Sequence, residues 1–339
     1  MTAELPASLR AGLLAESGAA SEERLAQSVG KLIEAYRSGK PASAPILASP
    51  VDVAAYAAYR MPATFAAVRT ALEQVRTAYP GFSPLSQLDV GGGTGAAAWA
   101  AADAFPDLSR ITVLDQVAEA LELGKRLAAR NLPPVDWRRW RAGDPAELPA
   151  ADLVTISYVL GELPAAAQAD LLDRARRAAG LLLVIEPGTP AGYERVLRAR
   201  DLLLEHGMTT VAPCPHQHAC PLTEVRGDWC HFAARVNRSA LHRRLKNAQL
   251  GHEDEKFSFV AVASGPSPAP ERTAPELLVP DGRVLRHPQF RKGMVTMQLC
   301  RAEGTAGPAI VSKKHGDLYR TARDVSWGDA WFSGPSQLP

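Results

Sequence analysis

A run of glycines is the feature that most constrains how this chain can fold. Residues 88–95 read Leu-Asp-Val-Gly-Gly-Gly-Thr-Gly, so an apolar strand end leads into a glycine turn and then into an alanine-rich stretch over residues 96–102. Glycine lets the chain turn sharply from strand to helix, and it lets a ligand approach the backbone where any Cβ would obstruct it. The segment therefore predicts a nucleotide-type cofactor site. Its fixed positions are Asp89, Gly91, Gly93 and Gly95.

A carboxylate ends the next apolar run along the chain. Residues 111–114 lead into Asp115, which stands twenty residues after Gly95. A carboxylate at the end of a second strand can accept hydrogen bonds from both hydroxyls of a ribose. The glycines alone could form an ordinary tight turn. Together with Asp115 they favour a bound nucleotide-like cofactor.

The acidic residues indicate which cofactor is bound. Asp89 is unfavourable beside a pyrophosphate but suits a cationic ligand. With its D-x-G-x-G-x-G spacing, the turn resembles motif I of the class I S-adenosylmethionine-dependent methyltransferases more than the G-x-G-x-x-G of NAD enzymes. This resemblance implies S-adenosylmethionine as the cofactor, with Asp144 beside the adenine. It also implies that residues 151–157 are the fourth strand, and Tyr158 at its end completes the expected cofactor-binding set.

Short apolar runs alternate with helical patterns from residue 85 onward, which is typical of a parallel α/β sheet. The predicted strands cover residues 87–90, 111–115, 135–139, 153–157 and 181–186, and the helices between them cover 96–104, 117–131 and 165–179. Upstream, residues 21–33 and 51–79 have helical periodicity, with a break expected at Met61-Pro62. The predicted fold class is α/β: a class I methyltransferase Rossmann-like sheet with an N-terminal helical cap.

The sequence does not identify the residues that would carry out a reaction. Residues 157–164 end the fourth strand, where catalytic groups of such sheets usually lie, but the polar-Pro-Pro-aromatic tetrapeptide expected of an amino-methylating enzyme is absent. Glu162 could act as a base or could cap the next helix. Tyr56, Tyr59 and Arg60 could bind a substrate, although a helical cap over the sheet explains them as well. The catalytic residues therefore stay unknown.

Composition limits the class of protein and the chemistry of its cysteines. Hydrophobic residues make up 46% and charged residues 22%, as in a soluble globular protein, and no apolar run is long enough to span a membrane. The first thirty residues carry four glutamates and no apolar signal-peptide core, so we expect a cytoplasmic location. In a reducing compartment, four cysteines are more often ligands or buried thiols than disulfides.

Three of the four cysteines lie close together in the sequence. Cys214, Cys220 and Cys230 fall within seventeen residues, and Cys300 follows a predicted strand over residues 294–299. Four thiolates suit either tetrahedral zinc or an iron–sulfur cluster. Gaps of five and nine residues are wider than those of zinc knuckles and fit a larger group, but spacing leaves zinc, iron–sulfur and unrelated buried thiols all open. The nearby histidines are substitute ligands or neighbours of such a site. They are His216, His218 and His231.

The charge of the chain is small overall and unevenly placed. The formal net charge is +2, but basic runs cover residues 137–141, 235–246 and 283–292. The run at 235–246 is predicted to be helical, either as a solvated helix face or as a contact for phosphates. A strand at 255–263 is expected at the sheet edge, a proline-rich loop at 266–280, and a last antiparallel strand of the same sheet at 294–300.

Several motifs together resemble the mitoribosomal small-subunit assembly family of methyltransferase-like proteins and its bacterial relatives. They are C-P-H-x-x-x-C-P-L (214–222), D-W-C-H-F (228–232), E-K-F-S-F (255–259), the pair Leu299-Cys300, and S-K-K-H-G-D-L-Y-R (312–320) with W-G-D (327–329). The likeness covers roughly residues 50–330. It implies a class I methyltransferase-like fold and binding to small-subunit ribosomal RNA. It also implies a 4Fe–4S cluster, whose ligands would be Cys214, Cys220, Cys230 and Cys300.

One main hypothesis and two alternatives follow. The chain would be a cytoplasmic, S-adenosylmethionine-dependent, methyltransferase-like iron–sulfur protein that acts on the small ribosomal subunit or its rRNA, without a membrane or DNA partner. The organellar branch of the family would be mitochondrial. The alternatives are a non-catalytic assembly factor that binds rRNA, and a zinc-containing small-molecule methyltransferase. The expected regions are a helical N-terminal region (1–80), a methyltransferase-like domain (81–265 with 290–303) that holds a cysteine-rich, basic, metal-binding insertion (211–250), and a basic C-terminal tail (304–339).

Overall fold

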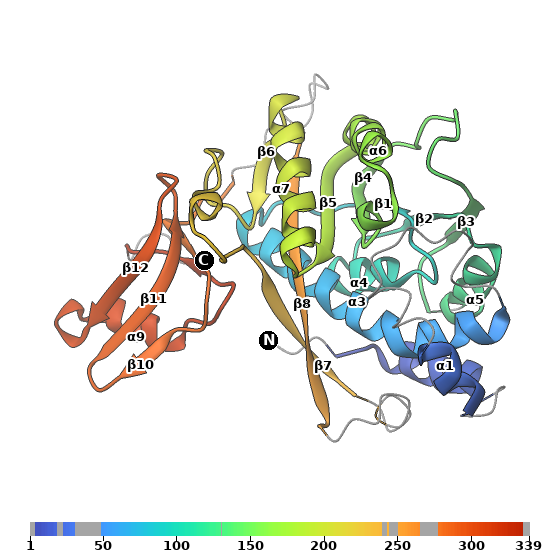
Figure 1. The fold of residues 1–339 in the computed structure, drawn as a ribbon, viewed down its shortest axis with the longest axis horizontal. Coiled ribbons are helices and arrows are strands. Elements are labelled where there is room, and N and C mark those ends of the chain that lie inside the picture. Colours follow the sequence, from blue (N-terminus) through green and yellow to red (C-terminus); the bar gives the residue numbers. More distant parts are fainter. Residues whose placement is uncertain are drawn as a thin grey trace.

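The computed structural model places two β-sheets side by side, the larger one covered by helices (Figure 1). It describes residues 4–18, 23–30, 49–129, 131–238, 243, 250–264 and 277–334. No helix in these ranges is both long enough and apolar enough to span a bilayer.

The larger sheet has eight strands within the described residues. They are β1 (Ser86–Val90), β2 (Arg110–Asp115), β3 (Val135–Arg139), β4 (Ala151–Ser157), β5 (Ala179–Pro187), β6 (Thr209–Ala212), β7 (Phe232–Asn237) and β8 (His252–Ala263). Their order is β3-β2-β1-β4-β5-β8-β6, with β7 paired to β8. The first five strands are parallel, and β8 runs antiparallel to β5 and β6. This is a class I methyltransferase Rossmann-like sheet, whose parallel half has the 3-2-1-4-5 order of doubly wound folds.

Helices cover both faces of this sheet. They are α1 (Ala7–Ser17), α3 (Pro50–Ala78), α4 (Ala96–Ala104), α5 (Ala118–Ala128), α6 (Ala165–Ala178) and α7 (Pro190–Glu205), with short turns η1 (Leu160–Glu162) and η2 (Pro221–Glu224). Alternate residues of the strands face opposite sides: Leu183 packs with α3 and α4, whereas Val184 packs with α6 and α7. Because helices cover both faces, the inner strands β4 and β5 are largely apolar and buried, whereas the edge strand β3 is polar and mostly exposed.

A second, smaller sheet holds most of the C-terminal region. Its strands are β9 (Gly282–Val284), β10 (Gln289–Arg291), β11 (Met294–Arg301), β12 (Ala306–Ser312) and β13 (Ala330–Trp331). The turn η3 (Lys313–His315) leads into α9 (Asp317–Asp324), whose Ala322 packs with Val295, Met297 and Leu299 of β11. Residues 304–334 are therefore part of a folded unit, and the expectation of a simple basic tail is wrong for them.

Two strand predictions are also corrected. Met294–Arg301 is the central strand of the second sheet and does not return to the first one, because it pairs with β9, β10 and β12. The strand His252–Ala263 lies inside the large sheet and not at its edge, since β5, β6 and β7 all pair with it. Its second half, residues 257–263, is completely buried, which is typical of a strand with neighbours on both sides.

Helix predictions need smaller corrections. The break expected at Met61-Pro62 is wrong: α3 runs unbroken through Pro62, and extensive burial of its apolar side chains offsets the one backbone hydrogen bond that proline removes. The basic run is not helical at its start, where Arg235 belongs to β7. Residues 239–242 and 244–246 of that run lie outside the described residues, as do 266–276 of the proline-rich loop and 21–22 and 31–33 of the first predicted helix.

We expect the substitution Phe65→Ala to test the packing of α3. Phe65 is fully buried, so the variant should lose about 3–5 kcal/mol of unfolding free energy. Chemical denaturation measures this loss. Phe290→Ala provides the matched control, because Phe290 is 57% exposed and its removal should cost less than about 0.5 kcal/mol. Equal losses in the two variants would contradict the described core.

Candidate functional site

The glycine turn has the backbone geometry that its sequence predicts. Gly91, Gly93 and Gly95 have φ values of 69°, 54° and 85°, a region that favours glycine. A Cβ on Gly91 would also lie 2.4 Å from a methyl carbon of Val159. The turn therefore requires glycine for conformation and for space.

Asp115 reaches this turn from the end of β2. Its Oδ2 accepts a hydrogen bond from the Gly93 amide at 2.8 Å, and its Oδ1 accepts one from the Val117 amide at 2.8 Å. Burial raises the pKa of Asp115, while these amides act in the opposite direction. Each carboxylate oxygen can accept a further hydrogen bond, so a ribose diol remains chemically compatible with this position.

Asp89 lies beneath the turn, where its side chain has no exposed surface. Thr155 donates a hydrogen bond to its Oδ1 at 2.8 Å, whereas Oδ2 has no partner among the described residues. Burial raises the pKa of Asp89 to about 7, and repulsion from Asp115 adds to this shift. The carboxylate thus supports the turn from below, and its role as a direct cofactor ligand stays a prediction.

The other two predicted cofactor-binding residues are engaged within the protein. Asp144 follows β3 in the sequence and accepts a hydrogen bond from the Arg141 amide at 2.8 Å. Tyr158 has φ of 62° and donates its hydroxyl to Glu255 Oε1 at 2.9 Å. The Arg60 guanidinium lies 4.4 Å from the centre of the Tyr158 ring and forms an ion pair with Glu255. Arg60 therefore joins α3 to β4 and β8, which supports the view of α3 as a helical cap.

Glu162 lies in η1, close to other acids of the cofactor region. The expectation that it might cap the next helix is wrong, since α6 begins after Pro164 without a side-chain cap. Desolvation raises the pKa of Glu162 to about 7, and repulsion from Asp115 and Glu186 adds to it. A carboxyl group with this pKa can accept or donate a proton near neutral pH.

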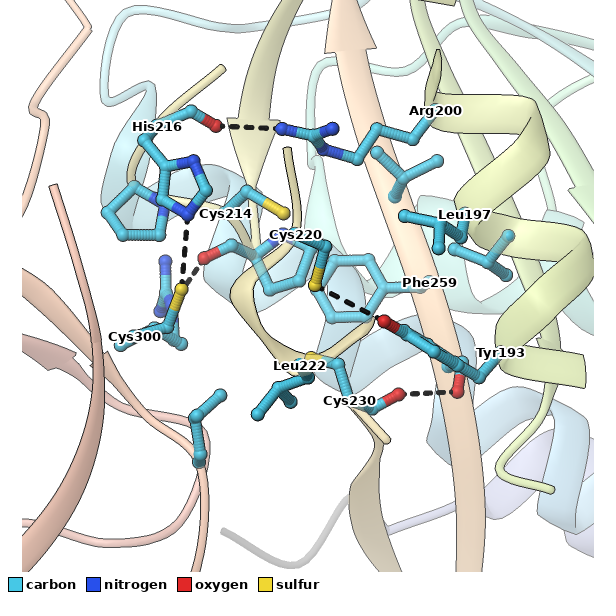
Figure 2. Close-up of a pocket in the computed structure, with 17 residues that line it drawn as sticks. Tyr193, Leu197, Arg200, Cys214, His216, Cys220, Leu222, Cys230, Phe259 and Cys300 are labelled. Carbon is cyan, nitrogen blue, oxygen red and sulfur yellow. Dashed lines mark hydrogen bonds between the residues drawn. The ribbon is translucent and has the colours of Figure 1, made fainter. Parts of the chain in front are cut away.

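The four cysteines line one cavity, although they come from four separate segments (Figure 2). Cys214 follows β6, Cys220 precedes η2, Cys230 precedes β7, and Cys300 lies in β11 of the second sheet. The cavity has a volume of about 40 Å³, which is room for more than one water-sized group. The structure thus brings together the residues that the sequence grouped as a metal site.

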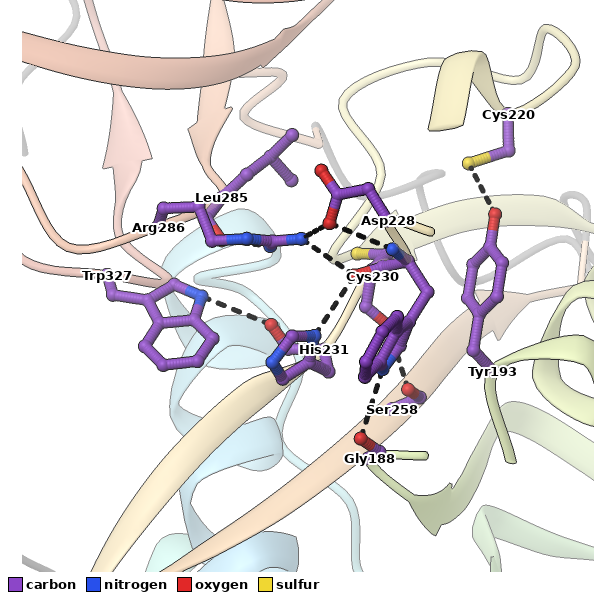
Figure 3. Close-up of polar contacts among 11 residues, drawn as sticks. Gly188, Tyr193, Cys220, Asp228, Cys230, His231, Ser258, Leu285, Arg286 and Trp327 are labelled. Atoms are coloured by element: carbon purple, nitrogen blue, oxygen red, sulfur yellow. Dashed lines mark hydrogen bonds and ion pairs between the residues drawn. The ribbon is translucent and has the colours of Figure 1, made fainter. Parts of the chain in front are cut away.

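Polar contacts surround the thiols. His216 Nε2 lies 3.2 Å from the Cys300 sulfur, and the Tyr193 hydroxyl donates to the Cys220 sulfur at 3.3 Å. The Ser258 hydroxyl donates to the Cys230 carbonyl at 2.8 Å (Figure 3). His216 is thus a neighbour of a predicted ligand.

Two buried arginines face the same cavity, and the sequence did not reveal them. Arg200 from α7 is 3% exposed, donates to the His218 carbonyl at 2.6 Å and forms an ion pair with Asp201 at 2.9 Å, while its Nε has no partner among the described residues. Arg283 from β9 is 2% exposed and donates to the Pro213 carbonyl at 2.9 Å. Burial lowers the pKa of Arg283 to about 10, and the neighbouring cysteines partly offset this effect. The only available signal was that Arg283 stands directly before the apolar pair Val284-Leu285.

Burial raises the pKa of three of the thiols and so favours their protonated form. It raises the pKa of Cys300 to about 12, and repulsion from Cys214 and Cys220 contributes. The pKa values of Cys214 and Cys230 are raised in the same way. Thiolate ligation therefore requires a cation that displaces these protons.

Within the described ranges, no group of three or more His, Cys, Asp or Glu side chains is arranged to hold a metal ion. The metal-binding character of the insertion is therefore not established by the geometry. The four thiols nevertheless line one cavity together with the buried Arg200 and Arg283.

The second sheet closes one side of this cavity. Leu285 and Cys300 pack with Leu222, Arg286 pairs with Asp228, and Trp327 donates its indole N–H to the His231 carbonyl at 3.1 Å (Figure 3). The cavity consequently forms only when the two sheets lie together.

Comparison with known proteins agrees with the motifs. A family model described as "Mitochondrial small ribosomal subunit Rsm22" matches residues 50–332. The chain belongs to the Rsm22 family. The matched residues span the glycine turn, all four cysteines and most of the second sheet, so the family is defined by both sheets together.

Two named relatives of the Rsm22 family are mitochondrial proteins. The human "Ribosome assembly protein METTL17, mitochondrial" is 32% identical over 296 residues, covering 81% of this chain and 61% of the relative. The "Rsm22-cox11 tandem protein 2, mitochondrial" of Schizosaccharomyces pombe is 25% identical over 326 residues, covering 82% of this chain and 43% of the relative. The chain therefore matches less than two thirds of either relative.

Solved methyltransferase structures are only distantly similar. Human N-acetylserotonin methyltransferase in complex with S-adenosylmethionine has a TM-score of 0.40 and 18% identity, with 70% of this chain and 67% of that chain covered. This likeness carries no inference about activity.

We expect Asp89→Asn to change how stability depends on pH. The folded pKa of about 7 exceeds the ordinary value of 3.8, so the stabilising contribution of Asp89 is complete below about pH 4 and is lost as pH rises through about 7. Between about pH 5 and pH 8, the wild type should lose roughly 2–3 kcal/mol more than the variant, which has no carboxylate here. Urea unfolding of both proteins at each pH measures the difference. A difference that is constant with pH would refute the assignment.

Proposed function

We propose that this chain is a methyltransferase-like iron–sulfur protein that binds S-adenosylmethionine and acts on the small ribosomal subunit or its rRNA during assembly. The observation that supports it most directly is the cavity lined by Cys214, Cys220, Cys230 and Cys300. Three thiols from one short stretch and a fourth from a distant strand are unlike the scattered buried cysteines of an ordinary core. The Rsm22 family match supports a role at the small ribosomal subunit.

Charge balance supports a bound anionic centre. Arg283 is buried and forms no ion pair among the described residues, and a buried cation without an anion costs several kcal/mol. Arg200 is also buried, and its guanidinium pairs with Asp201 at 2.9 Å. Deprotonated cysteines around an iron–sulfur core carry net negative charge and would compensate Arg283. Tyr193 would donate its hydroxyl to the Cys220 sulfur, as it already does in the structure.

The preference for an iron–sulfur cluster over zinc comes from the sequence. The gaps of five and nine residues between the cysteines are wider than those of zinc knuckles, and the motifs resemble a family that holds a 4Fe–4S cluster. The structure contributes the placement of all four cysteines around one cavity. Zinc would remain the interpretation for a colourless protein.

The glycine turn and Asp115 support the cofactor assignment. The turn leaves its backbone accessible without Cβ atoms, and the Asp115 carboxylate faces it from β2. S-adenosylmethionine, when bound, supplies an activated methyl group. The protein would contribute mainly by positioning an RNA nucleophile, which is a large effect when reacting groups are well aligned.

The ribosomal partner is proposed from the relatives. METTL17 is named as a ribosome assembly protein and the family model as a small-subunit protein. The chain matches only part of these relatives, so its ribosomal partner is a proposal. The cytoplasmic location predicted for this chain stays a prediction beside relatives named as mitochondrial.

A non-catalytic assembly factor is the second candidate, and one observation favours it. Tyr158 at the end of β4 is covered by Arg60 and bound to Glu255, so a residue near the expected acceptor site is tied to the protein itself. In this case the methyltransferase-like domain would be a scaffold for RNA binding.

We expect Cys300→Ser to abolish the iron–sulfur centre. The anaerobically purified wild-type protein should absorb broadly at about 400 nm and contain iron and sulfide in matching amounts, because thiolate-ligated clusters have these properties. The variant should lose both signals, since Cys300 is the ligand supplied by the second sheet. Met297→Leu on the same strand is the matched control and should keep them. A colourless wild type that contains zinc would overturn the proposal.

We expect Asp115→Ala to weaken S-adenosylmethionine binding by roughly tenfold or more, because charged hydrogen bonds contribute about 1.5–3 kcal/mol. Calorimetry measures binding, and tritium transfer from labelled cofactor to small-subunit RNA measures catalysis. The control is Asp136→Ala, an exposed aspartate on β3. Transfer that is lost only in Asp115→Ala supports an enzyme. Cofactor binding without any transfer under assembly conditions supports the scaffold, and unchanged binding in Asp115→Ala contradicts the cofactor site.

A further inference from the structure

One face of the second sheet has two different halves. In β11, Met294, Thr296, Gln298 and Cys300 lie on the same face, since alternate residues of a strand point the same way. The Cys300 end of this face closes the cysteine cavity, and Arg283 on the paired strand β9 shares it. The opposite face is covered by α9. Toward Met294, however, the face that carries Cys300 extends beyond the cavity.

This continuation is exposed. Cross-strand pairing places Gln289 and Ile310 beside Thr296, and Arg291 and Ser312 beside Met294. Ile310 is 59% exposed, and the side chains of Gln289, Arg291 and Gln298 are exposed as well. We call this surface the open sheet face. It consists of Gln289, Arg291, Met294, Thr296, Gln298 and Ile310.

Positive charge gathers along one rim of the open sheet face. The Lys313 amide donates to the Gly293 carbonyl at 3.1 Å, which holds the β10–β11 turn beside η3. Four exposed cations meet there: Arg291, Lys292, Lys313 and Lys314. None of them forms an ion pair with another described residue, whereas Arg320 nearby in α9 pairs with Asp317. The three strands β10, β11 and β12 contain no Asp or Glu.

We propose that the open sheet face and its four rim cations bind the phosphate backbone of folded RNA. This inference rests on the proposed ribosomal function and names the surface that serves it. Unpaired lysines and arginines without neighbouring acids attract phosphates. The amides of Gln289 and Gln298 and the hydroxyl of Thr296 are suited to ribose 2′-hydroxyls, which distinguish RNA from DNA.

The same strand connects this surface with the cysteine cavity. Thr296 and Cys300 are four residues apart on β11, or roughly 13 Å along the strand. A centre that holds Cys300 in place would therefore fix the orientation of the RNA-binding face relative to the larger sheet. The RNA bound to this face would lie next to the cysteine loop.

The test is RNA binding by the full chain, measured over a range of salt concentrations. Lys313→Gln with Lys314→Gln should lower the affinity for a small-subunit rRNA transcript by about tenfold or more. It should also reduce the slope of log affinity against log salt by about two, one for each lost phosphate contact. Ile310→Asp, which adds negative charge to the open sheet face, should lower affinity similarly. A DNA copy of the transcript should bind the wild type more weakly.

The matched control removes two positive charges elsewhere. Arg10→Gln with Arg110→Gln changes exposed residues of α1 and β2, far from the second sheet, and should leave affinity and slope nearly unchanged (Figure 1). Unfolding midpoints equal to that of the wild type verify that each variant is folded. If the wild type binds the transcript and both surface variants bind it equally well, the open sheet face is not the RNA-binding surface, while the proposed function stands. If the wild type does not bind the transcript, the proposed function fails together with the surface.

Discussion

Two buried arginines beside four cysteines are the physical constraint on which the rest of the structure depends. Arg200 lies in α7, which packs on the larger sheet, and Arg283 lies in β9 of the second sheet. Both side chains are almost completely buried. Arg200 pairs with Asp201, whereas Arg283 forms no ion pair among the described residues, and a thiolate-ligated centre would supply the negative charge that neutral thiols lack. The same contacts join the second sheet to the first, because Arg283 binds the Pro213 carbonyl and Cys300 lies beside His216. The residues that set the charge of the cavity are thus the same ones that hold the two sheets together.

The fold was predictable where short-range patterns determine it. The five parallel strands and the helix Ala96–Ala104 match the sequence prediction closely, because the inner strands β4 and β5 have long apolar runs and the glycine turn marks the first crossover. The strand Met294–Arg301 was placed in the wrong sheet, since its alternation fits an antiparallel strand in either. The partner of a strand depends on distant segments, here β9 and β12, and one sequence does not reveal those pairings.

The candidate site was predictable in its reactive residues but not in their surroundings. Cysteines are rare enough for spacing and family motifs to group Cys214, Cys220, Cys230 and Cys300, which line one cavity. Arg283 was not recognised, because a basic residue in a basic run is normally exposed, and burial is a property of the packed sheets. The hydrogen bond that Asp89 accepts from Thr155 joins neighbouring strands, and the sequence alone does not reveal it.

The most direct test of the account is an anomalous scattering map of anaerobically grown crystals at the iron absorption edge. The account predicts a compact group of iron atoms in the cavity, within bonding distance of all four cysteine sulfurs, one of them contributed by the second sheet. A single zinc peak, or an iron centre that leaves the Cys300 sulfur unbound, would contradict it.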